Sequence, residues 1–324
     1  MEISADSLYR RTFWQAAKRV WRHPGLIWLG IGAAFLGNGG DIEVALNKFF
    51  LLQNQGDWLS FFVQSSWLTF FGTIEWAALP IIVFGLVVGL ALMLLGSLAQ
   101  VAVIHSAHDA ASGEVADVTV YLRRARGLFL KAFSFYALSK ILIWAVFIIL
   151  ILPSLINAFF QLNLEPSFSI TIIGYLVLIP GSFYLSLLAR LSIFSLVLSG
   201  SSWRGALRQA RALWNKHWLA LIEVSAVVFL ANTIFALAVA AIFFLGLSPV
   251  NVILSSGPAA VWGRDIIVFI FLIVVILVGG LISLWQYQVW TQIYTELISD
   301  LSIRSKAARV YDTVINKLKN RFRK

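Results

Sequence analysis

The sequence contains no cysteine among its 324 residues, and only 12% of the residues are charged. Without cysteine the chain has no disulfide bond, no thiolate nucleophile and no cysteine-based metal site. Soluble domains carry about a quarter charged residues, so this composition argues against an ordinary soluble protein. Apolar residues are abundant instead: 60% of the chain is hydrophobic, and 13 residues are tryptophan, which anchors membrane proteins at the headgroup level.

Acidic residues are also scarce, with 15 Asp and Glu against 25 Lys and Arg, which gives a net charge of +10. Such a charge can indicate nucleic-acid binding. Here the basic residues recur beside long apolar stretches, as they do at the flanks of membrane spans. We therefore expect anionic membrane lipids as partners, with a membrane protein complex as the alternative, and no nucleic acid.

Six largely apolar stretches, with few charged residues inside them, predict transmembrane helices, each of which needs about 20 residues, although the first stretch is shorter than that. The stretches lie at 24–38, 76–108, 134–160, 168–198, 218–247 and 266–298. A further uncharged segment, 58–74, has Gln64, Ser65 and Ser66 at its centre. We interpret it as an interfacial or re-entrant segment, and a seventh span is the alternative.

The basic residues predict the orientation of these spans. Lys and Arg are concentrated before the first span, between the second and third, between the fourth and fifth, and after the sixth. The opposite side carries only Lys48 and Arg264 as cations. By the positive-inside rule, both termini of this multi-pass protein are expected in the cytoplasm, with the chain in the inner (cytoplasmic) membrane.

Basic amphipathic segments recur along the chain. YLRRARGLFLKAF at 121–133 matches ALRQARALWNKHW at 206–218, and FWQAAKRVWR at 13–22 is a weaker copy. Each copy comes directly before a pair of expected spans. The sequence therefore predicts an all-α integral membrane protein with six transmembrane helices in three pseudo-repeats, each an interfacial amphipathic helix plus a membrane hairpin.

The expected boundaries follow from this repeat. A membrane domain covers 1–300, and a basic amphipathic C-terminal helix covers 301–324. The repeats within the membrane domain lie at about 7–113, 117–200 and 202–300, and their interfacial helices at roughly 7–23, 117–131 and 202–216.

The basic segments have helical periodicity as well as charge. Arg11, Gln15, Lys18 and Arg22 fall at i, i+4, i+7 and i+11, which makes one polar stripe. We expect such a helix to lie flat on the membrane with its apolar side down, and a basic flank without defined structure is the alternative. The cations expected to bind lipid or a partner are Arg11, Lys18, Arg22, Arg123, Arg126, Arg204, Arg208, Arg211, Lys317 and Arg321.

Ionisable residues inside the expected spans are candidates for function. Lys140 and Glu223 follow repeat-equivalent lysines by nine and seven residues, so they lie at similar depth and can form an ion pair. The alternative is that both side chains extend to the headgroups. Gln100, Arg190 and Gln286 occupy matching positions in the even-numbered spans, which predicts one polar layer, either a structural hydrogen-bonded ring or part of a substrate path.

No catalytic constellation is visible in the sequence. His105, His108 and Asp109 share one helical face, but at a span end where water reaches, so we interpret them as structural or interfacial, with a metal site or proton relay as the alternative. Motifs of hydrolases, kinases, nucleotide binders and HExxH metalloproteases are absent. We therefore expect no catalytic residues, no cofactor and no metal, and a lipid-modifying enzyme is the least favoured class.

Three segments resemble a group of bacterial six-helix integral membrane families. They are FWQAAKRVWRHPGLIWLGIGAAFLG from residue 13, ALRQARALWNKHWLALIEV from residue 206 and TQIYTELISDL from residue 291. The group includes the membrane domain fused to some glycerophosphoryl diester phosphodiesterases. The resemblance implies the six-span plan but no activity, because a phosphodiesterase barrel of about 250 residues does not fit in this chain.

Two functions remain as expectations. The first is a non-enzymatic membrane protein that organises lipid or a membrane protein complex through its basic interfacial helices. The alternative is a transporter or channel for a small or lipid-like molecule, indicated by Lys140, Glu223, Arg190 and the Pro180-Gly181 pair in the fourth span. A through-going or lateral cavity lined by these residues favours the alternative, and a closed apolar bundle favours the first function.

Overall fold

The computed structural model describes residues 5–36, 79–114, 117–160, 168–253 and 258–299. Within these ranges every regular element is a helix, which confirms the expected all-α class. The elements are α1 (Ala5–Arg22), the 3-10 helix η1 (Pro24–Leu26), α2 (Ile27–Ala34), α6 (Leu79–Ser112), α7 (Val118–Ala125), α8 (Phe129–Phe160), α9 (Phe168–Leu198), α10 (Trp203–Ile253) and α11 (Pro258–Ile298). The segment 58–74 and the tail 301–324, with Lys317 and Arg321, lie outside the described residues.

Five of these helices, α6, α8, α9, α10 and α11, are long and apolar enough to cross a membrane, as expected for a multi-pass membrane protein. The stretch expected as the first span, 24–38, corresponds in the described residues to a short apolar helix, Pro24–Ala34. At the helical rise it is about 16 Å long, roughly half of the hydrocarbon thickness. The described helices therefore establish five candidate spans rather than six.

Three helices form the interior of the protein at one end, which we call the core end. The segments 101–104 of α6, 191–197 of α9 and 286–291 of α11 are buried at every position. Since successive helical residues point in different directions, each helix is covered on all sides there. The ring of Phe194 stacks on that of Tyr294, with centroids 5.7 Å apart, and so joins α9 to α11.

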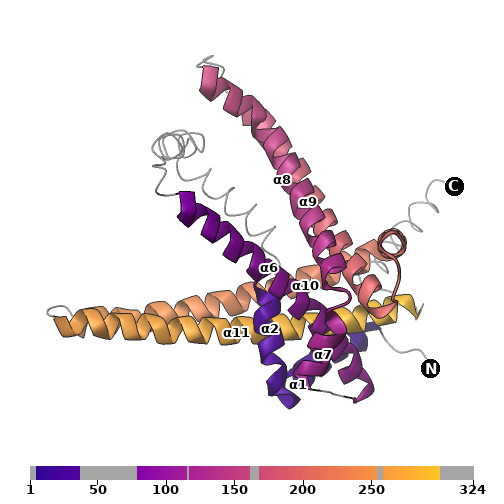
Figure 1. The fold of residues 1–324 in the computed structure, drawn as a ribbon, viewed down its shortest axis with the longest axis horizontal. Coiled ribbons are helices and arrows are strands. Elements are labelled where there is room, and N and C mark those ends of the chain that lie inside the picture. Colours follow the sequence, from indigo (N-terminus) through magenta and orange to yellow (C-terminus); the bar gives the residue numbers. More distant parts are fainter. Residues whose placement is uncertain (1–4, 37–78, 115–116, 161–167, 254–257, 300–324) are drawn as a thin grey trace, which may run out of the picture.

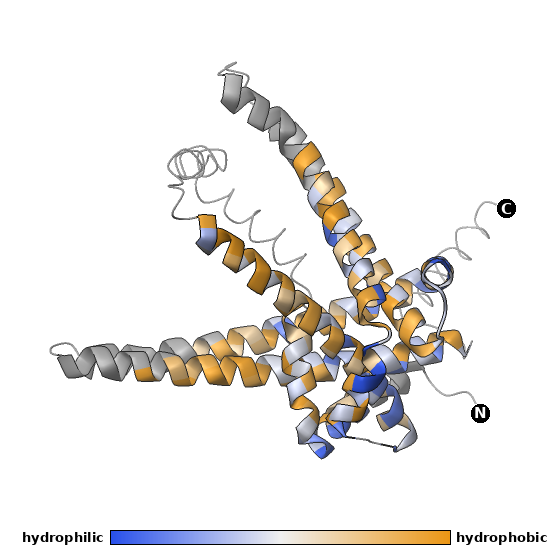
Figure 2. Ribbon diagram, viewed as in Figure 1, coloured by the Kyte–Doolittle hydropathy of each residue, from blue (hydrophilic) through white to orange (hydrophobic). Residues whose placement is uncertain are grey.

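Away from the core end the long helices diverge. Figure 1 shows α6, the α8–α9 hairpin and the α10–α11 hairpin leaving in three directions, and in Figure 2 the coloured parts of these helices beyond the core end are mostly hydrophobic. Phe84, Leu176 and Phe269 are among the exposed apolar side chains there. Among the residues whose burial is described, the buried core is therefore concentrated at the core end. Between helices in lipid there is little hydrophobic driving force, so contacts concentrate where polar and small residues occur.

Small residues let α2 insert between α6 and α11. A Cβ atom at Gly30 would lie 2.2 Å from the carbonyl oxygen of Gly280, and one at Gly280 would lie 2.4 Å from the Cγ1 of Ile31. On the other side, a Cβ at Gly32 would lie 2.6 Å from that of Ala99. Gly280 is therefore a point of close approach between helices, and α2 is the partner of α11 there.

The three expected amphipathic helices are present, with altered boundaries. α1 covers the first, and residues 203–216 of α10 cover the third, which ends at a non-helical residue, His217 (φ −130°, ψ 25°). The second, expected at 117–131, is only the eight residues of α7. The chain turns at 126–128, around Gly127, before α8 begins, because glycine interrupts a helix readily.

Candidate functional site

A cavity of about 100 Å³ lies at the core end, where the five long helices meet before they diverge. It is partly open to the outside, and α8, α9 and α10 supply most of its wall. Its lining residues are Leu36, Gln100, Tyr136, Ser139, Lys140, Phe183, Ser186, Leu187, Ala189, Arg190, Ile193, Ser225, Val228, Phe229, Asn232 and Tyr287. These sixteen described residues include two cations and no carboxylate, so the cavity is electropositive.

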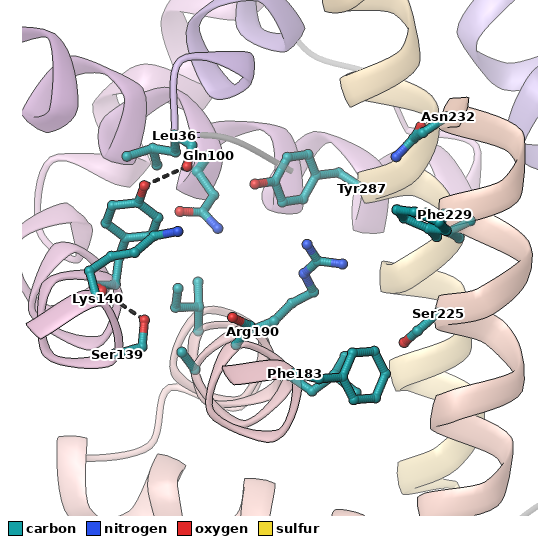
Figure 3. Close-up of a pocket in the computed structure, with 16 residues that line it drawn as sticks. Leu36, Gln100, Ser139, Lys140, Phe183, Arg190, Ser225, Phe229, Asn232 and Tyr287 are labelled. Carbon is teal, nitrogen blue, oxygen red and sulfur yellow. Dashed lines mark hydrogen bonds between the residues drawn. The ribbon is translucent and has the colours of Figure 1, made fainter. Parts of the chain in front are cut away.

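The two cations come from neighbouring helices and both extend into the cavity (Figure 3). The Nζ of Lys140 lies 5.1 Å from the ring centroid of Tyr136, one turn earlier on α8. The guanidinium of Arg190 lies 5.2 Å from the ring centroid of Trp290, on α11. Contacts with aromatic faces stabilise desolvated cations without neutralising them, so these contacts leave the positive charge of the cavity in place.

Neutral polar groups complete the wall. The side chain of Gln100 is only 6% exposed, points into the cavity, and its Oε1 has no hydrogen-bond partner. The hydroxyl of Tyr136 donates to the backbone oxygen of Leu36 over 2.6 Å and fastens α8 to the end of α2. Asn232 accepts a hydrogen bond from the Nε2 of Gln286. A buried amide without a full set of partners is costly and often marks a ligand or water position.

Two of the three residues expected to form one polar layer line this cavity directly, Gln100 and Arg190. The third, Gln286, is linked to it through Asn232. Lys140 joins them, whereas Glu223 is not among the lining residues, and its Oε2 is buried without a hydrogen-bond partner. The Lys140–Glu223 pair stays a prediction.

Sequence reasoning missed several residues of the wall. Asn232 is an amide in the apolar part of α10, and its polarity was a usable signal. Tyr287 lies next to Gln286 but was not singled out, because an aromatic residue near a membrane surface is common. Ser139 and Ser225 bond to backbone oxygens of their own helices, so their position at the cavity depends on helix rotation. Sequence spacing alone does not give this rotation.

A second candidate surface is formed by the basic helices. On α1, Thr12, Ala16 and Val20 are buried. Lys18 and Arg22 are exposed, and so are the rings of Trp14 and Trp21, by 73% and 78%. The helix therefore uses its small side chains to pack on the core end and presents cations and indoles outward. The expectation that the whole apolar side of this helix faces the membrane is therefore wrong for Val20, which is buried in the protein, whereas Trp21 is exposed.

Polar contacts fix the rotation of α1. The guanidinium of Arg19 donates to the Oε1 of Gln292 on α11 over 3.4 Å, and Gln292 donates to Gln15 over the same distance. Partial burial lowers the pKa of Arg19, although an arginine remains protonated under ordinary conditions.

The other two basic helices have the same organisation. Tyr121 and Ala125 of α7 are fully buried, and so are Ala206 and Ala210 of α10. The indole of Trp203 stacks on Phe135 of α8, with centroids 4.8 Å apart, so the first part of α10 is docked on the neighbouring hairpin. The cations of these helices are exposed: Arg123, Arg124, Arg126, Arg204, Arg208, Arg211 and Lys216. Arg11 is in α1, and the exposure of its side chain is not described.

The cluster of His105, His108 and Asp109 on α6 has a structural contact. An oxygen of Asp109 accepts a hydrogen bond from Arg124 of α7 over 2.9 Å, in an exposed ion pair. This pair ties α7 to the end of α6.

The resemblance to six-helix membrane families stays a prediction, and the functional assignment depends on the geometry described above. No protein-family model matches this chain, and neither a curated protein nor a solved structure is similar enough to count as a match.

Proposed function

We propose that this protein is a non-enzymatic component of the cytoplasmic membrane that binds anionic lipid at its core end and so organises lipid or a membrane protein complex. The main observation in support of this proposal is that three basic helices bury one face in the protein and expose their cations. The concentration of Lys and Arg beside the spans supports a cytoplasmic position for this end and for both termini.

The arrangement of the helices supports the three pseudo-repeats. α6, α9 and α11, the second helices of the three expected hairpins, together form the interior of the core end. The amphipathic helices of the expected repeats pack around them. In this proposal each repeat contributes one basic helix to the surface of a shared, mainly apolar interior.

Rigid anchoring matters for binding strength. A cation near an anionic membrane surface contributes about 1 kcal/mol. Arg204, Arg208 and Arg211 lie on a segment whose Ala206 and Ala210 are fully buried, so their backbone is held in place before lipid binds. Because less conformational entropy is lost when lipid binds, more of this attraction remains as affinity.

The test replaces Arg204, Arg208 and Arg211 with Gln in the full chain and measures binding of labelled phosphatidylglycerol in detergent micelles across a salt series. The matched control replaces the same residues with Lys, which keeps the charge. We expect the Gln variant to bind up to about a hundredfold more weakly at low salt, because three contributions are lost. The Lys variant should bind nearly as the wild type does. Equal, salt-independent affinity of all three proteins would refute the proposal.

A second candidate function is favoured by the cavity. A transporter or channel for a small or lipid-like molecule needs polar groups within the helical region, and Gln100, Lys140 and Arg190 meet there. This candidate is tested by measuring the rate at which labelled lipid moves between the two leaflets of vesicles that contain the protein. Loss of flipping on replacement of Arg190, with the basic helices intact, supports it, and absence of any flipping by the wild type refutes it.

A further inference from the structure

We propose that the cavity between α6, α8, α9, α10 and α11 binds the phosphate group of an anionic lipid, with Lys140 and Arg190 as its charged ligands. This proposal specifies the ligand of the second candidate function, and it rests on that function for the lipid-like nature of the ligand. It is distinct from the exposed cations of the basic helices, because none of these cations lines the cavity.

Charge is the first reason. Lys140 and Arg190 extend into one cavity, and none of the sixteen described lining residues is acidic. Ionisable residues inside a membrane protein often mark the path or site of a ligand. A phosphate oxyanion complements the positive charge of this lining, and it accepts the two parallel N–H bonds that a guanidinium offers.

The neutral groups are the second reason. Gln100 is buried, directed into the cavity, and lacks a partner for its Oε1. An amide presents both a donor and an acceptor. Its NH2 can donate to a phosphate oxygen, while its oxygen accepts from a headgroup hydroxyl. A headgroup with a phosphate and a free hydroxyl, such as that of phosphatidylglycerol, satisfies the cations and the amide together.

Shape is the third reason. The volume of about 100 Å³ suits a compact headgroup, whereas pockets for drug-sized molecules enclose about 300–1,000 Å³. Phe183, Val228 and Phe229 give part of the wall an apolar surface. Beyond the cavity the α8–α9 and α10–α11 hairpins diverge and expose apolar side chains, including Ile141 and Leu230. A lipid whose phosphate lies inside the cavity and whose acyl chains lie along these hairpins matches both the polar cavity and the apolar surfaces.

The test measures phosphatidylglycerol retained by the full-length protein in detergent after washing at about 1 M salt, where the Debye length is about 3 Å. We expect one lipid per protein in the wild type and about ten- to hundredfold weaker binding in Arg190→Gln and Lys140→Gln. Lys140→Arg keeps the charge and should retain the lipid, and so should Lys131→Gln, at an exposed position near the start of α8. Unchanged retention by both cavity variants would overturn the proposal.

Two further binding measurements identify the molecule that carries the phosphate. Phosphatidylcholine has a neutral headgroup overall and should be retained poorly. Inorganic phosphate should compete only weakly with phosphatidylglycerol. If inorganic phosphate binds as tightly as the lipid does, the cavity is a phosphate site, and the claim that its ligand is a lipid is refuted. If the triple arginine variant of the basic helix loses binding at low salt while the cavity variants do not, the surface proposal stands and the cavity proposal fails.

A second readout avoids variants that fail to fold. Because the chain has no cysteine, Ser225→Cys places a single thiol in the cavity with little change in size. Phosphatidylglycerol should slow its reaction with a maleimide about tenfold or more at saturation, whereas phosphatidylcholine should not. The matched control is Ser112→Cys, at the exposed end of α6, whose rate should not change. Equal rates for Ser225→Cys with and without phosphatidylglycerol would contradict the site.

Discussion

The contact between α2 and α11 gives a sharp test of how the core end is assembled. Adding a methyl group at Gly280 places its Cβ 2.4 Å from the Cγ1 and 3.0 Å from the backbone nitrogen of Ile31. Ordinary contact begins at 3.4 Å, so the helices must separate by up to about 1 Å. Residue 279, directly before it on the same helix, has no atom within 4 Å of an added Cβ.

The magnitude follows from this difference. Overpacking of a closely packed contact costs about 1–3 kcal/mol, while replacing a helical glycine by alanine gains up to about 1 kcal/mol in helix propensity. Since Gly279→Ala and Gly280→Ala share the propensity gain, their comparison isolates the steric cost. We expect Gly280→Ala to be less stable than Gly279→Ala by about 1–3 kcal/mol.

Thermal unfolding of the purified protein in detergent measures this difference. Gly30→Ala is a second variant of the same contact, because its Cβ would meet a backbone oxygen, that of Gly280, at 2.2 Å. A carbonyl oxygen has no rotamer to change, so Gly30→Ala should lower the melting temperature at least as much as Gly280→Ala does. If all three variants have the same melting temperature, α2 does not pack against α11 as described.

The remaining predictions concern topology and the tail. A cysteine replacing Ile170, in α9, should be labelled by an impermeant maleimide only from outside intact cells, and the Ser112→Cys variant only after the membrane is opened; the reverse pattern would contradict the positive-inside orientation. Deletion of 301–324 should leave the long helices inserted, and it should weaken phosphatidylglycerol binding in a salt-dependent manner because eight Lys and Arg are lost. Binding that is equal with and without the tail would limit the tail to a role in topology.

Much of the fold could be predicted because membrane spans leave a strong signal in the sequence. Long, largely apolar stretches gave the five long helices, and the basic periodic segments gave α1, α7 and the first part of α10. The short α7 was not predicted, because the pattern of 121–133 continues through Gly127 while the chain turns there. The divergence of the hairpins was not predicted either, since hydropathy does not specify which apolar surfaces contact each other.

The candidate site could be predicted only in part. Gln100 and Arg190 were found because they occupy matching positions in the expected repeats, and Lys140 because a charge within a span is conspicuous. Whether Asn232 and Tyr287 face the cavity depends on the rotation of α10 and α11 about their axes, and tertiary packing sets this rotation. Likewise, the buried sides of α1 and of the first part of α10 were expected to face lipid, because amphipathicity alone does not distinguish a protein core from a membrane.

The most direct measurement for the central proposal is mass spectrometry of the lipid that stays with the protein when it is extracted from its own membrane. The account predicts that anionic phospholipid is enriched over the bulk membrane composition. It also predicts that this enrichment falls when the exposed arginines at 204, 208 and 211 are replaced by glutamine. Bound lipid with the composition of the bulk membrane, unchanged in that variant, would contradict it.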